Sequence, residues 1–187
     1  MVFDGVKLFD INNLRLCQIY LSQKKIECVT AWFTPSLINF QPVCVRDILS
    51  NGDLHITDGH TRTYVAWLNG IKQIPVIYDN DEIVSCKLGQ IQYENDIEWC
   101  KRFNLHNISS LSDRILSEED YEVFWRGRCE KMYNLEVALL EGKILKKQFN
   151  SKKLSLQNQG LYVYGISEDL SVIYYENKQG ELFEAFY

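Results

Sequence analysis

Residues 53–79 read DLHITDGHTRTYVAWLNGIKQIPVIYD, and this stretch decides the fold. Near its start, LHIT (54–57) is a short apolar run that predicts a strand. Near its end, IPVIY (74–78) predicts a second strand, with its proline at the strand start, where a missing N–H group is tolerated. Between them, residues 61–69 follow a helix-compatible pattern that ends at an Asn-Gly helix stop. The stretch therefore predicts a strand, a turn, a helix and a strand, in that order.

The turn between the first strand and the helix reads Asp58-Gly59-His60-Thr61-Arg62. A glycine can take a positive φ, and a helix that begins directly after it directs its first backbone N–H groups toward an anion. Arg62 falls in the first helical turn, where a positive charge is unfavourable unless it meets an anion. The turn therefore predicts a site for phosphate or carboxylate, although Asp58 and Gly59 also fit a plain helix cap.

The residues before this stretch predict a strand, a helix and one arm of a hairpin. Residues 7–16 suit an opening strand and turn. Residues 22–33 place apolar side chains at helical spacing, with Ser22 as the N-cap and a proline just past the end. Residues 42–47 form a β-branched run, and a turn cluster separates this run from the strand at 54–57, which is a hairpin signal.

Beyond residue 79 the pattern becomes helical, and we divide the helical stretch at residues 104–107 and 116–117. Ser117 is followed by three acidic residues, which is typical of a helix start. We expect this helix to continue to about Met132.

From Gly160 onward, three alternating runs separated by turn residues predict an antiparallel three-stranded meander. The expected fold class is therefore α+β. Residues 1–85 are expected to form a domain with a mixed sheet and helices. Residues 86–187 are expected to form a helical segment and the C-terminal β-meander, packed on the first domain.

Composition and charge limit the classes of function. The chain has 187 residues, 46% of them hydrophobic, so it can bury a substantial core. Its formal net charge of −5 argues against a broad nucleic-acid footprint, because that affinity comes largely from Lys and Arg. No apolar run approaches the roughly 20 residues that span a bilayer, and the first residues lack a signal-peptide pattern. We therefore expect a cytoplasmic protein with no membrane segment.

Six cysteines are scattered along the chain without a CxxC pair. This spacing is typical neither of a zinc site nor of a dense disulfide framework. We expect reduced and mostly buried thiols.

The ordered combination of ITDGHTR, TYVAWLNG and IPVIY resembles the ParB N-terminal and sulfiredoxin-like superfamily. The mark of that superfamily is a strand, a glycine-containing turn that ends in arginine, a helix, a glycine and a short Ile-Pro-Val-type strand. The resemblance covers about residues 40–79. It implies that the chain binds a nucleotide, ATP or CTP with Mg²⁺, through backbone amides and through Gly59, His60, Thr61 and Arg62.

The branches of this superfamily differ in the turn and in their chemistry. Sulfiredoxins carry Gly-Cys-His-Arg, and this chain has His60 in place of the attacking cysteine, which argues against sulfiredoxin activity. The turn of chromosome-segregating ParB proteins is richer in arginine. Free-serine kinases carry Asp-Gly-His-His-Arg, which this turn matches except at Thr61. The resemblance to that branch adds Mg²⁺-dependent phosphoryl transfer to a small molecule as a candidate activity.

Under the kinase interpretation, the catalytic candidates are Asp58, His60 and Glu27, and Arg62 assists as a phosphate-binding residue. Asp58 would hold Mg²⁺ or accept a substrate hydroxyl proton, while His60 and Arg62 would neutralise charge on the phosphoryl group. Glu27, on the preceding helix, is the candidate for a second carboxylate. Two other classes stay open: a non-catalytic ligand-sensing or protein-interaction module, and a nuclease-like or DNA-associated protein. Each is compatible with a homo-oligomer.

Other polar residues have plainer interpretations. His55 lies inside an apolar strand, so we expect it to be structural or solvated. Arg126, Arg128 and Lys131 form a small basic patch, which we interpret as a solvated helix face.

Overall fold

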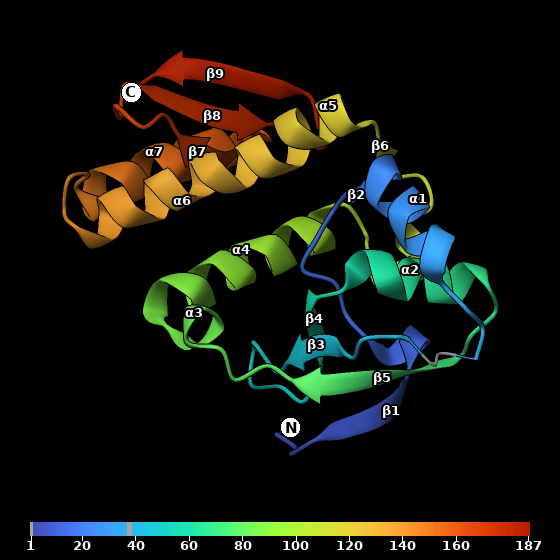
Figure 1. Cartoon of the computed structure of the whole chain (residues 1–187). Coiled ribbons are helices and arrows are strands. Elements are labelled where there is room, and N and C mark those ends of the chain that lie inside the picture. Colours follow the sequence, from blue (N-terminus) through green and yellow to red (C-terminus); the bar gives the residue numbers. More distant parts are fainter. Residues whose placement is uncertain (1, 37–38) are drawn as a thin grey trace. The chain divides into compact units, whose positions relative to one another are not determined.

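The computed structural model describes residues 2–36 and 39–187. The chain forms two compact units, Met1–Tyr121 and Glu122–Tyr187 (Figure 1). The first unit therefore contains the predicted mixed sheet together with the helical residues that follow it, past the boundary expected after residue 85.

The first unit is built on a four-stranded mixed sheet with the strand order β1-β5-β3-β4. β1 (Val6–Asp10) is antiparallel to β5 (Gln73–Tyr78), which is parallel to β3 (Val43–Arg46). β3 is antiparallel to β4 (His55–Asp58), as the predicted hairpin requires. The short η1 turn (Ile11–Asn13) follows β1. The predicted mixed sheet is confirmed.

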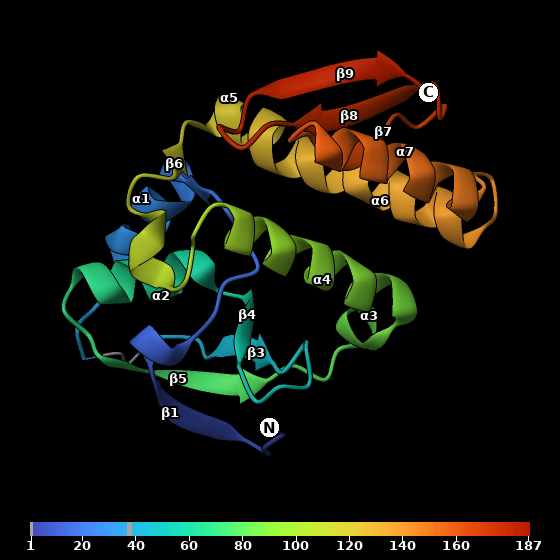
Figure 2. The same ribbon diagram turned by 180° about the vertical axis from the view of Figure 1, so that it is seen from behind.

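Two helices lie on one face of this sheet and pack against each other (Figures 1 and 2). α1 (Gln23–Trp32) begins where the Ser22 hydroxyl accepts a hydrogen bond from the Lys25 backbone N–H at 3.2 Å, so the predicted N-cap is confirmed. α2 (His60–Leu68) is the predicted helix of the central stretch and joins β4 to β5.

The remainder of the first unit returns the chain to the start of α1. After α3 (Glu82–Ser85), α4 (Lys87–Arg102) and the η2 turn (Ile108–Leu111), the short strand β6 (Ile115–Leu116) pairs in parallel with β2 (Leu21–Ser22). The predicted helix start at Ser117 is confirmed, because the Ser117 hydroxyl accepts the Asp120 N–H at 3.1 Å. The helix that begins there, α5 (Glu118–Tyr121), therefore contacts β2, which directly precedes α1.

The interior of the first unit is aliphatic and comes from all parts of the unit. Its largest fully buried side chains are Ile11, Leu14, Ile19, Leu21, Leu54, Ile56, Ile74, Ile108 and Leu111. Because these side chains come from both before and after the 53–79 stretch, the sheet and the helices are held by one common core.

The second unit contains two long helices and the predicted meander. A π-helical turn, η3 (Glu122–Arg126), leads into α6 (Gly127–Leu140), and α7 (Lys146–Asn158) follows. The strands β7 (Tyr162–Ile166), β8 (Val172–Glu176) and β9 (Leu182–Phe186) pair antiparallel in that order, so the meander is confirmed.

The helix expected to end near Met132 continues to Leu140, which corrects its predicted length. The added turns are apolar on one side, where Leu135 and Ala138 belong to a buried cluster with Ile166 of β7. Tertiary packing therefore supports the turns beyond Met132, and the helix ends before Gly142, whose φ of +71° is typical of a helix stop.

Close packing of α6 on β7 depends on a glycine. A Cβ atom built at Gly165 would lie 2.4 Å from the backbone carbonyl carbon of Lys131, a distance that no side chain tolerates. The same approach brings Arg128 of α6 against β8, where it forms a buried ion pair with Glu176. The interpretation of Arg128 as a solvated residue is wrong, because its charge is neutralised inside the unit rather than by water.

The six cysteines are all free, as predicted, but they are not mostly buried. Cys17 and Cys100 are buried, Cys44 and Cys129 are half-buried, and the other two are exposed. In the described part of the chain, no helix combines the length and the apolar character needed to cross a membrane.

Candidate functional site

The turn between β4 and α2 has the geometry of an open helix start. Gly59 adopts φ 106° and ψ 17°, which lies in the region that favours glycine. The Thr63 N–H donates to the Gly59 carbonyl at 2.9 Å and so closes the first turn of α2. An α-helix leaves the N–H groups before that bond without intrahelical acceptors, and glycine has no side chain to cap them. The N–H groups of residues 60–62 are therefore suited to an anion.

Neighbouring side chains leave no room for a larger residue at position 59. A Cβ atom there would lie 3.0 Å from Cγ2 of Val43 and 3.0 Å from Nη2 of Arg62. A bulge in the β3–β4 pairing sits at the same place, because Cys44 faces Asp58 while Val45 faces Ile56. Both features fix the direction in which the strand enters the turn.

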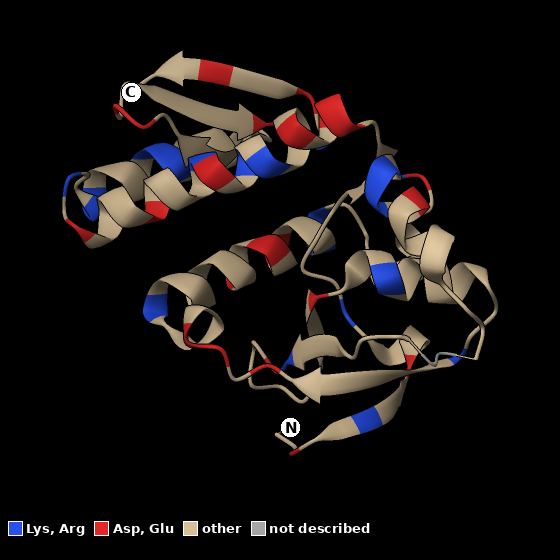
Figure 3. Cartoon of the chain, in the orientation of Figure 1, with Lys and Arg blue, Asp and Glu red and all other residues tan. Residues whose placement is uncertain are grey.

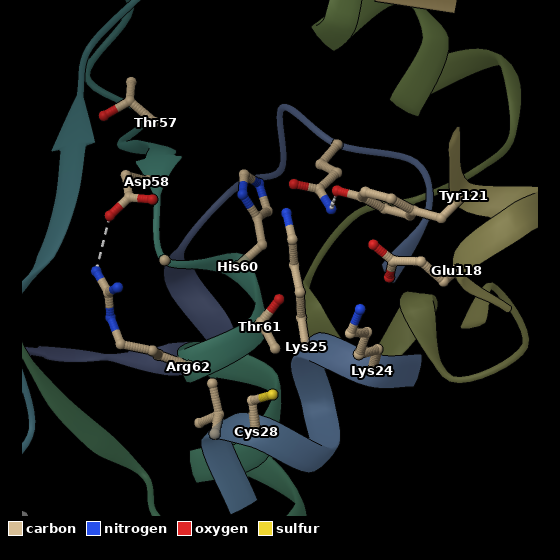
Figure 4. A pocket seen from close by; sticks show the side chains of 13 residues that line it. Lys24, Lys25, Cys28, Thr57, Asp58, His60, Thr61, Arg62, Glu118 and Tyr121 are labelled. Carbon is tan, nitrogen blue, oxygen red and sulfur yellow. Dashed lines mark hydrogen bonds and ion pairs between the residues drawn. The ribbon is translucent and has the colours of Figure 1, made fainter. Parts of the chain in front are cut away.

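A pocket of about 380 Å³ opens at this turn (Figure 4). Its walls come from the turn, from α1 and from α5, all within the first unit. The residues that line it are Gln18, Lys24, Lys25, Cys28, Val29, Thr57, Asp58, Gly59, His60, Thr61, Arg62, Glu118 and Tyr121. The pocket thus contains all five residues of the predicted turn together with side chains that the sequence did not indicate.

Two lysines of α1 add positive charge to the pocket. Figure 3 shows basic residues at the start of α1 and in the first part of α2. Within residues 2–36 and 39–187, neither Lys24 nor Lys25 is paired with a carboxylate. The Lys25 ammonium lies 4.9 Å from the centre of the Tyr121 ring, which restricts its position. The spacing of apolar residues predicted the helix, but it could not predict that Lys24 and Lys25 line the pocket.

Arg62 points to the edge of the pocket and pairs with Asp58. Its Nη2 donates to Oδ2 of Asp58 at 2.8 Å, and the Arg62 side chain is 18% exposed while that of Asp58 is 68% exposed. An ion pair with one solvated partner contributes little to stability. The Nε atom of Arg62 is buried and has no hydrogen-bond partner in the described chain. Arg62 therefore places a charged donor group at the edge of the pocket, although its Nε atom is not accessible from there.

His60 is buried and uncharged. Its Nε2 accepts the Cys17 backbone N–H at 3.2 Å. Burial lowers the pKa of His60 to about 3, an effect that the nearby Asp58 charge only partly opposes. A neutral imidazole cannot neutralise a phosphoryl charge, so the positive charge of the pocket comes from Lys24, Lys25 and Arg62. Through its hydrogen bond with the Cys17 N–H, His60 instead links the turn to the segment that precedes α1.

Glu27 lies on α1 but does not line the pocket. Its side chain is exposed and accepts a hydrogen bond from Gln23 one turn earlier, at 2.8 Å. The carboxylate that does join Asp58 in the pocket is Glu118 of α5. Sequence reasoning assigned Glu118 only to a helix start, and no local signal could have linked it to a turn so distant in the chain.

Asp58 by itself is a weak metal site. Among the described residues, no group of three or more His, Cys, Asp and Glu side chains is arranged to hold a metal ion. Mg²⁺, however, is commonly bound through one or two carboxylates together with the phosphates of a substrate. Asp58 therefore fits an Mg²⁺ ion that arrives with a nucleotide, and does not fit a resident ion held by protein ligands alone.

A comparison with known protein families and with curated proteins found no match for this chain. The chemistry of the pocket therefore has to be read from its own residues. Three cationic side chains and an open helix start surround one hollow, and two carboxylates stand at its edges. Such an arrangement can bind an anion and orient the rest of the ligand.

Proposed function

We propose that this chain binds the phosphate groups of a nucleotide in the pocket at the start of α2. One observation carries the proposal: the uncapped start of α2 lines the same pocket as Lys24, Lys25 and Arg62. Backbone N–H groups and basic side chains are the two kinds of donor that proteins use for phosphate.

The size of the pocket and the order of its elements support a nucleotide. A volume of about 380 Å³ lies within the range of small-molecule and cofactor sites. The strand, glycine turn, helix and strand occur in the order expected of the ParB N-terminal and sulfiredoxin-like superfamily, on a mixed sheet. These observations support our proposal that the fold is of that superfamily and that the ligand is ATP or CTP.

Each group in the pocket has a role under this proposal. The N–H groups of residues 60–62 donate to phosphate oxygens, and Arg62 turns its guanidinium from Asp58 to the phosphate. Lys24 and Lys25 add charge from the side of α1. Asp58, released from Arg62, contacts the Mg²⁺ that accompanies the nucleotide.

Binding, rather than phosphoryl transfer, is the function that the geometry favours. The kinase interpretation needs His60 as a cation near the phosphoryl group, and its buried, hydrogen-bonded imidazole is neutral. The binding proposal needs only groups that are present in the pocket and charged. It is compatible with a non-catalytic, ligand-sensing module.

The test is calorimetric titration of ATP and CTP, each with Mg²⁺, into the wild-type chain and into Arg62→Ala. Hydrogen bonds to charged groups contribute about 1.5–3 kcal/mol, so we expect the variant to bind at least about tenfold more weakly. Its melting temperature should stay close to that of the wild type, because the Arg62–Asp58 pair is partly solvated.

Arg15→Ala is the matched control. Arg15 also forms a solvated ion pair in the first unit, with Asp53 at 3.7 Å, but it does not line the pocket. Its removal should leave nucleotide binding unchanged. Full binding by Arg62→Ala, or no binding of either nucleotide by the wild type, contradicts the proposal.

A further inference from the structure

Glu118 is held in the pocket by the residue that caps α1. The Ser22 hydroxyl accepts the Lys25 N–H and donates its own hydrogen to Oε2 of Glu118 at 3.0 Å. A carboxylate has two oxygens and accepts several hydrogen bonds, so Oε1 stays available to a ligand. Within the described residues, Glu118 forms no ion pair that would occupy it. The side chain is therefore a positioned acceptor.

Gln18 supplies a second positioned acceptor in the same pocket. Its Nε2 atom donates to the Tyr20 backbone carbonyl and, at 3.3 Å, to the Tyr121 hydroxyl. A backbone carbonyl only accepts hydrogen bonds, so this contact identifies which end of the Gln18 amide is the nitrogen. Both amide hydrogens are then used. The group that Gln18 can offer to a ligand is the carbonyl oxygen Oε1.

The two sides of the pocket offer different groups. Figure 4 shows Asp58 and Arg62 on one side of Thr61 and Lys25, with Lys24, Glu118 and Tyr121 on the other side. The turn offers the N–H groups of α2 and the Arg62 guanidinium, whereas the wall beside α5 adds the acceptors Glu118 and Gln18, with Lys25 against the Tyr121 ring. A ligand that fills the pocket must carry an anionic group at one end and hydrogen-bond donors away from it.

We infer that Glu118 and Gln18 accept hydrogen bonds from the ribose hydroxyls of the bound nucleotide, so that the ligand is a ribonucleotide. This inference rests on the function proposed above. Hydroxyls fit better than an ammonium group, because Lys24 and Lys25 line the same pocket and would repel another cation. A carboxylate that accepts ribose hydroxyls is a general solution to nucleotide recognition.

The experiment measures the affinity of the full chain, with Mg²⁺, for ATP, 2′-deoxy-ATP and 3′-deoxy-ATP. The same series is measured for CTP, and tripolyphosphate is added as a ligand without a nucleoside. Removal of a hydroxyl that meets a charged acceptor should weaken binding by at least about tenfold for one of the two deoxy analogues. Tripolyphosphate has no ribose and reports on the phosphate end alone.

Two substitutions at Glu118 test the assignment. In Glu118→Ala the larger ratio between ribonucleotide and deoxynucleotide affinities should fall markedly, because the charged acceptor is gone and only the neutral Gln18 acceptor is left. Glu118→Gln can still accept the Ser22 hydrogen bond and should lower the ratio without loss of folding. Tripolyphosphate should bind both variants as well as it binds the wild type. Glu119→Gln, an exposed neighbour outside the pocket, is the control and should keep the wild-type ratio.

The possible outcomes separate this inference from the proposed function. Equal affinities for the ribonucleotide and both deoxy analogues in the wild type would overturn the inference but leave nucleotide binding intact. Equal weakening of tripolyphosphate and ATP by Glu118→Gln would also overturn it, because Glu118 would then act on the phosphate end. Absence of binding by the nucleotides and by tripolyphosphate would overturn the proposed function and the inference together.

Discussion

Arg62 of the first unit and Arg128 of the second unit both lie on helices, and each is paired with a carboxylate. The Arg128 side chain is 4% exposed and that of Glu176 is 1% exposed, and both guanidinium Nη atoms contact the carboxylate. Arg62 meets Asp58 through one nitrogen, and the Asp58 side chain is 68% exposed. The same two kinds of side chain therefore form a closed pair in one unit and an open pair in the other.

The difference shows what each arginine does. A buried, doubly hydrogen-bonded pair has already lost its water, so either partner left alone would be an uncompensated buried charge. An open pair at a pocket can exchange its carboxylate for a ligand anion at little expense in stability. We therefore expect Arg128 to stabilise the second unit, whereas Arg62 remains available for the ligand binding proposed above.

The largest expected effect tests the closed pair. Arg128→Met leaves Glu176 buried without its cation, so we expect a loss of about 3–5 kcal/mol in the free energy of unfolding. Urea unfolding followed by circular dichroism measures this loss. The double variant Arg128→Met/Glu176→Met should recover most of it, because no charge is then buried. A single variant as stable as the wild type would remove the contrast between the two arginines.

A smaller loss of stability is expected from substitution of Gly59, which lies next to Arg62 of the open pair. Gly59→Ala combines a positive φ with contacts of 3.0 Å to Val43 and Arg62, and should lower stability by about 2–3 kcal/mol. Gly70→Ala is the control, because Gly70 has φ +74° but no atom within 4 Å of the added Cβ. Thermal unfolding of both variants separates crowding from backbone strain. An equal loss at the two positions would show that crowding around Arg62 is unimportant.

The smallest expected effect is the pH dependence of stability. It refines the comparison between the closed and open pairs, because His60 is buried although it lies beside the open pair. Its pKa in the folded chain, about 3, lies below the ordinary value of 6.5, so the unfolded chain takes up the proton first as the pH falls. The stabilisation from neutral His60 is fully present above pH 6.5 and decreases below it. Between pH 7 and pH 5 the wild type should lose about 2 kcal/mol through this residue.

His60→Gln is the matched variant, because its amide oxygen can accept the Cys17 N–H in place of Nε2. Its unfolding free energy should depend less on pH over this interval by about that amount. Parallel urea titrations at pH 7, 6 and 5 provide the measurement. Identical pH dependence of the two chains would mean that folding does not lower the pKa of His60.

Local signals in the sequence determined much of the fold. The alternation of apolar residues, the Ser22 cap and the glycine turn at residue 59 depend on neighbours a few positions away, so the strands of the mixed sheet, α1, α2 and the meander could be predicted. The short strands β2 and β6 were not predicted. The burial of Arg128 could not be predicted, because it depends on β7 and β8, whose contact with α6 the sequence does not reveal. The end of α6 has a local signal in Gly142, at φ +71°, which the predicted end near Met132 missed.

The candidate site divides in the same way. Gly59, Thr61 and Arg62 were predicted because a strand, a glycine and a helix start follow one another directly in the chain. The opposite wall of the pocket depends on the parallel pairing of β2 with β6, which brings Glu118 within 3.0 Å of Ser22 across 96 positions of sequence. No periodicity or cap encodes such a contact. Only the common core of the first unit, which buries residues from both segments, brings those groups into one pocket.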